Sequence, residues 1–133
     1  MAIRPGGQGD VTDSHVLWRE GRSVPEVPMP LLWESKVYMV AGAGIVTCLD
    51  ATSGRVLFRG RLGATGAYFA SPVAAAGHIY FATAEGQITV IDAADRLNVI
   101  ATNDLQDAVY ATPAIVGSTL YVRTAHDLYA FAE

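Results

Sequence analysis

The chain has 133 residues, of which 51% are hydrophobic and 17% are charged, and its formal net charge is -4. This length suits a single domain with one core. The nine Lys and Arg residues are scattered, which excludes a basic nucleic-acid surface, and no apolar run reaches the roughly 18 residues of a membrane span. The single cysteine, Cys48, excludes an internal disulfide.

The chain begins with a polar, glycine-rich segment, residues 1–14, which we expect to form a loop or arm. It contains no apolar stretch of the kind found in secretory signals, so the sequence as written favours the cytoplasm, while the compartment itself stays unassigned. Residues 15–19 (HVLWR) resemble residues 56–59 (VLFR) at an offset of 40 positions, which predicts a lone outer strand. A polar connector with two prolines, residues 20–28, follows.

Three similar segments make up the remaining sequence: residues 29–60, 71–102 and 112–132. Tyr38 and Tyr80 are 42 positions apart, and Tyr121 follows Tyr80 by 41. Each segment opens with a proline and an apolar run, then continues through a polar turn, an apolar strand, a second turn and a third strand. The first two segments add a fourth strand. The second strands are almost continuously apolar, which indicates burial on both faces.

Four short antiparallel strands at a period of about 42 residues are typical of a β-propeller blade. We therefore predict an all-β fold with three blade-equivalents and twelve strands, in which the strand at residues 15–19 matches the outer strand missing from the last segment. Because propellers typically have about four to eight blades, three blades do not close a ring. We expect a head-to-tail homodimer with six blades, in which each N-terminal strand completes the partner's last blade. The alternative is a truncated fragment of a longer propeller.

Two stretches, residues 38–51 and 80–93, share one pattern: Tyr, then Gly six positions later, and an apolar residue followed by Asp-Ala at the end. With the segment LDATSGRVLF that begins at Leu49, this pattern resembles the repeats of the quinoprotein, or PQQ-like, β-propeller family. The resemblance implies a propeller over residues 16–131. The family that the chain resembles contains PQQ-dependent dehydrogenases and outer-membrane assembly factors, and many of its members are periplasmic. The dehydrogenases use an adjacent cysteine pair, which Cys48 alone does not provide.

We therefore expect a non-enzymatic scaffold or binding module that holds neither PQQ nor another cofactor and no metal. The alternative from a different class is a remnant or half of a quinoprotein-type oxidoreductase. Loops on a rigid scaffold commonly carry binding, so the connectors between blades are the expected contact surface for a protein or small ligand at one mouth of the channel. The candidate contact residues are Tyr68, Tyr110, Arg123 and Asp104.

Other chemically active side chains have a structural interpretation. Asp50 and Asp92 occupy equivalent positions after a third strand, so we expect them to form turns. Cys48 is expected to be a buried, inert thiol. The three histidines, His15, His78 and His126, are expected to be solvated residues rather than metal ligands.

Overall fold

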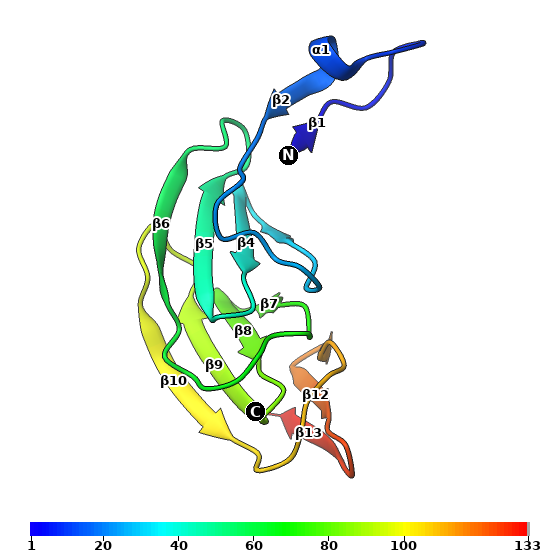
Figure 1. Cartoon of the computed structure of the whole chain (residues 1–133). Helices are drawn as coiled ribbons and strands as arrows, with labels where there is room; N and C mark the ends of the chain where they lie inside the picture. Colours follow the sequence, from blue (N-terminus) through cyan, green and yellow to red (C-terminus); the bar gives the residue numbers. More distant parts are fainter. Residues whose placement is uncertain (133) are drawn as a thin grey trace.

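The computed structural model describes residues 1–132 and contains four antiparallel sheets that follow one another along an arc (Figure 1). The N-terminal hairpin consists of β1 and β2, and α1 lies between them. Blade 1 has the order β3-β4-β5-β6, blade 2 the order β7-β8-β9-β10, and blade 3 the order β11-β12-β13. The bounds are β1 Ala2–Ile3, α1 Thr12–His15, β2 Val16–Trp18, β3 Leu31–Trp33, β4 Lys36–Val40, β5 Ile45–Asp50, β6 Val56–Arg61, β7 Val73–Ala75, β8 His78–Ala82, β9 Gln87–Asp92, β10 Val99–Asp104, β11 Ala114–Val116, β12 Thr119–Arg123 and β13 Leu128–Ala132.

The three repeated segments form the three blades, which confirms the predicted all-β propeller class. The strands of each blade are joined by tight turns in sequence order, so neighbouring strands along the chain are also neighbours in the sheet. The two outer strands, β6 and β10, both lie on the convex side of the arc (Figure 1). They end at Arg61 and Asp104, one and two residues beyond the predicted ends of the first two segments at 60 and 102.

The turn after β5 confirms the structural role that the sequence predicts for Asp50. Its Oδ1 atom accepts hydrogen bonds from the backbone N–H of Ser53 at 2.7 Å and of Thr52 at 3.2 Å. Gly54 ends the turn with φ of +71°, a conformation that glycine adopts without steric cost. An aspartate followed by glycine four positions later therefore reverses the chain between the third and fourth strands of blade 1.

The largest group of buried side chains lies between blades 1 and 2 and includes Tyr38, Cys48, Tyr68 and Phe81. A smaller group joins blades 2 and 3 around Val109 and Val122. Burial raises the pKa of the Cys48 thiol to about 11, so its reactive thiolate form is suppressed at neutral pH, as expected of an inert thiol. The chain is thus held together by apolar contacts between the faces of successive blades.

The three repeated tyrosines do not share one environment. Tyr38 is fully buried, whereas Tyr80 is half-buried and Tyr121 is 36% exposed. The nearly continuous apolar second strands, to which these tyrosines belong, predict that all three are buried, and this is wrong for Tyr121. Tyr38 lies between two blades, while Tyr121 belongs to the last blade of the arc.

The N-terminal region is more ordered than the sequence predicts. Residues 1–14 contain β1 and most of α1, and β2 is paired with β1 instead of standing alone. Residues 1–132 therefore contain thirteen strands rather than the predicted twelve. Trp18 donates from Nε1 to the carbonyl oxygen of Ala51 at 2.9 Å, and Arg59 forms an ion pair with Glu20 at 2.9 Å. These contacts attach β2 and the connector that follows it to blade 1.

Candidate functional site

A groove of about 650 Å³ separates parts of blades 2 and 3. Its walls come from β8 and β9 on one side and from β11, β12 and β13 on the other. Most of the lining is apolar, and its larger side chains include Tyr80, Ile88, Leu105, Leu120 and Phe131. Apolar concave surfaces of this size are common places for ligands and partner segments to bind.

The corresponding region between blades 1 and 2 is filled by Leu97, which precedes β10. A Cβ atom at Gly60 of β6 would lie 2.6 Å from Leu97 Cδ2, which shows how closely the two blades approach there. Gly60 pairs with Val46, and the equivalent pair in blade 2 is Asn103 with Ile88. Both Asn103 and Ile88 line the groove. The groove thus lies where a residue equivalent to Leu97 would fit if blade 3 had an outer strand.

The outer edge of β13 lies beside this groove. In the described part of the chain β13 pairs with β12 and has no strand on its other side. Leu128, at the start of β13, is 70% exposed, and Phe131 is partly exposed while lining the groove. An unpaired strand edge offers backbone donors and acceptors to a further strand, and neighbouring apolar surface adds to the stability of such pairing.

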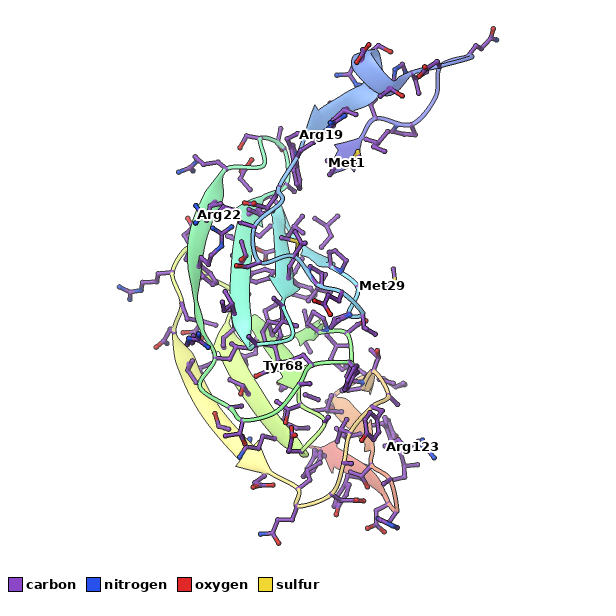
Figure 2. All side chains as sticks on the ribbon, in the orientation of Figure 1. Met1, Arg19, Arg22, Met29, Tyr68 and Arg123 are labelled. Carbon is purple, nitrogen blue, oxygen red and sulfur yellow. The ribbon has the colours of Figure 1, made fainter. Side chains whose placement is uncertain are left out.

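The predicted contact residues do not come together at this groove. Tyr68 is 2% exposed and belongs to the core between blades 1 and 2, where burial raises the pKa of its hydroxyl to about 12. Tyr68 therefore has no surface to offer a ligand at the channel mouth. In Figure 2 it lies in the middle of the molecule, whereas Arg123 points outward from blade 3. The ring of Tyr68 packs inward over Gly44. A Cβ atom at Gly44 would lie 3.2 Å from Tyr68 Cε2.

The other candidates are exposed but lie on different connectors and strands. Tyr110 is 61% exposed and packs against Phe69, with ring centroids 5.9 Å apart. Arg123 ends β12, and Asp104 ends β10, where its carboxylate accepts a hydrogen bond from the backbone of Gln106 at 2.8 Å. Among residues 1–132 neither Arg123 nor Asp104 forms an ion pair. The aromatic pair of Phe69 and Tyr110 is a contact between successive connectors that sequence reasoning missed.

A second missed feature links the starts of the inner strands. The backbone N–H of Met29 donates to Ser71 Oγ at 2.9 Å, and the N–H of Ser71 donates to Thr112 Oγ1 at 3.0 Å. The three residues each precede the proline that opens a repeated segment. The sequence feature that could have predicted these bonds is the hydroxyl residue before two of the prolines, Ser71 and Thr112. The two bonds align the starts of successive blades.

Asp107 joins the connector before β11 to the turn between β12 and β13. Its Oδ2 atom accepts from the backbone N–H of His126 at 2.9 Å, and its Oδ1 atom lies 3.0 Å from His126 Nδ1. The hydroxyl of Thr124, then the backbone of His126, hold the pKa of Asp107 far below its usual range. His126 is therefore a partner of Asp107 within a turn, and residues 1–132 contain no cluster of three or more potential metal ligands.

We expect the contact between Asp107 and the turn that contains His126 to stabilise the chain less in acid. The folded-state pKa of Asp107 is depressed, so its contribution is fully present above the unfolded value of about 3.9 and is lost as pH falls toward the folded value. Urea unfolding at pH 5 and pH 3 should show a larger loss for the natural chain than for Asp107→Asn, whose amide does not titrate. Equal losses in the two chains would contradict this role for Asp107.

Successive antiparallel sheets packed face to face, each beginning at its inner strand, define this chain as a set of β-propeller blades. The chain belongs to the family described as outer membrane protein assembly factor BamB, whose model matches residues 9–132. This match confirms the PQQ-like propeller resemblance seen in the repeats. No helix in residues 1–132 is long and apolar enough to cross a membrane.

The fold is similar to the crystal structure of BamB from Moraxella catarrhalis, with a TM-score of 0.61 and 23% sequence identity. The similarity covers 77% of this chain and 32% of that chain, so the present chain spans about a third of the length of the structure it matches. No curated protein matches the chain.

Proposed function

We propose that this chain is a non-enzymatic propeller module that binds an extended protein strand at the outer edge of β13. The observation that carries the proposal is the free edge of β13 beside the apolar groove between blades 2 and 3. Strand addition at such an edge combines backbone hydrogen bonds with burial of alternate side chains. The family description, which names an assembly factor, supports a role in protein binding rather than chemistry.

The proposed occupant of this edge is β2 of a second copy. Residues 15–19 match β6 of blade 1 in sequence, and the fourth position of blade 3 is the place that β6 occupies in blade 1. Two chains joined head to tail in this way would form six blades and cover the end faces of both arcs. The ring would then present its connectors, including the pair of Phe69 and Tyr110, to a further protein or small ligand.

The alternative proposal is a segment of a longer single-chain propeller. The 32% coverage of the BamB chain favours it, since a complete propeller of that size would need further blades. In that case another part of the same protein would supply the strand beside β13, and the isolated chain would remain monomeric.

The two proposals differ in solution mass. Sedimentation velocity over a concentration series is expected to show a transition from the 14.1 kDa chain to twice that mass. Leu128→Asp should weaken the dimer, because the exposed Leu128 lies on the proposed edge, while Val99→Asp on β10 is the matched control. A monomer at every concentration would contradict the homodimer. A saturable absorbance change on titration with PQQ and Ca²⁺ would contradict the absence of a cofactor.

A further inference from the structure

The N-terminal hairpin repeats the pairing of the outer two strands of a blade. In blade 1 Cys48 pairs with Phe58 and Leu49 with Val56, and the register shifts between the two pairs. In the hairpin Ala2 pairs with Trp18 and Ile3 with Val16, again with a shift between them. Since β2 matches β6 in sequence, Ala2 and Ile3 occupy the positions of Cys48 and Leu49 in a third strand.

The turn that follows each third strand supports this equivalence. The backbone N–H of Arg4 donates to the carbonyl oxygen of His15 at 2.8 Å. The equivalent bonds run from Asp50 to Arg55 at 2.9 Å in blade 1 and from Asp92 to Asn98 at 3.1 Å in blade 2. The three bonds close turns of different length at the same place in the sheet. β1 is therefore a two-residue copy of a third strand, and β2 is the outer strand paired with it.

Contacts with blade 1 hold β2 in the place of a preceding blade's outer strand. Trp18 packs against the turn after β5, where a Cβ atom at Gly54 would lie 2.5 Å from Trp18 Cγ and Cδ2. The hydrogen bond from Trp18 to Ala51 and the ion pair of Glu20 with Arg59 fix the same segment. These contacts do not involve β1, so β2 keeps its position on blade 1 if β1 is replaced by another strand.

The third strand of blade 3 carries the matching residues. The repeat aligns Ile88 with Leu128, so that Val90 and Ile91 align with Ala130 and Phe131. The same two positions are Cys48 and Leu49 in blade 1, and Ala2 and Ile3 in the hairpin. Ala-Ile at the N-terminus and Ala-Phe in β13 are therefore two occupants for one edge of β2.

We infer that β1 is a displaceable stand-in for β13, and that Ala130–Phe131 of a second copy replaces Ala2–Ile3 on β2 when two chains join. This inference rests on the proposed function, of which it specifies the partner segment and the step that releases it. The exchange favours β13 because β13 has five residues and β1 has two. Met1 is 69% exposed and Ile3 57% exposed, so little apolar surface is lost when β1 leaves.

Engineered disulfides separate the two pairings. Ile3→Cys with Val16→Cys locks β1 onto β2 within one chain, because these residues are paired there. Val16→Cys with Phe131→Cys joins two chains, since β2 and β13 lie at opposite ends of the arc (Figure 1). Val16→Cys with Leu128→Cys is the control, as it lies three positions out of register. Cys48 is fully buried and can remain in all variants.

We expect the locked variant to dimerise at least about tenfold more weakly when oxidised than when reduced. We also expect the Val16→Cys, Phe131→Cys variant to form a covalent dimer under mild oxidation, and the out-of-register control to form little. Equal dimerisation of the locked variant in both redox states would overturn displacement of β1 while leaving the homodimer intact. If neither the natural chain nor a chain lacking residues 1–5 dimerises, the proposed homodimer itself fails and the displacement fails with it.

Discussion

Replacing Gly86 by alanine is expected to destabilise the chain by about 3 kcal/mol or more. Gly86 lies in the turn between β8 and β9 and has φ of +88°, where an L side chain is strained. A Cβ atom there would also lie 2.3 Å from the carbonyl oxygen of Asp107 and 3.1 Å from its backbone nitrogen. These are backbone atoms of the connector to blade 3, so the clash is relieved only by moving that connector.

Gly63 provides a matched control. It has the same φ of +88°, but a Cβ atom there would meet no atom within 4 Å. Gly63→Ala should therefore cost only the backbone strain, about 1–2 kcal/mol. Urea unfolding followed by far-ultraviolet circular dichroism measures both changes. Similar losses in the two variants would show that the contact between Gly86 and the Asp107 backbone does not hold blades 2 and 3 together.

Tyr38→Ala is expected to destabilise the chain by about 3–5 kcal/mol, while Tyr121→Ala should cost less than about 1 kcal/mol. The two residues occupy the same position of the repeat. Tyr38 is fully buried between blades 1 and 2, with its ring 6.4 Å from that of Phe58. The Tyr121 side chain is 36% exposed, so replacing it by alanine leaves no comparable cavity.

The comparison should be made by urea unfolding at a protein concentration where the chain is monomeric. At that concentration an equally large loss for Tyr121→Ala would contradict the partial exposure of Tyr121 in the single chain. If the loss for Tyr121→Ala grows as concentration rises into the range of the dimer, a second copy is the cover. The pair of variants therefore reports both on the core and on the proposed assembly.

Several site features were predictable because they depend on neighbours in sequence. Asp50 forms its turn with Ser53 and Thr52, three and two positions later, so a local pattern was sufficient. The burial of Cys48 was predictable because the strand around it is apolar. Tyr68 was not predictable in this way, because a connector residue can point toward solvent or toward the core. Its packing over Gly44 joins segments 24 positions apart.

The pairing of β1 was missed for a related reason. Ala2–Ile3 is too short to show a strand pattern, and its equivalence to Cys48–Leu49 appears only in the register with Trp18 and Val16. The sequence of residues 15–19 identified the outer strand but not its partner. The groove beside β13 also depends on how blades 2 and 3 pack, which no local pattern contains.

The sequence by itself determined the blades, their period and their order, because alternating strands and turns are set by residues within a few positions of one another. The tertiary structure decided which repeated residues are buried and which strand pairs with β2. Tyr38 and Tyr121 show the difference, since one local pattern leads to a core residue in blade 1 and a partly exposed residue in blade 3. Burial depends on the blade that packs against each face, and that neighbouring blade lies about 40 residues away in the sequence.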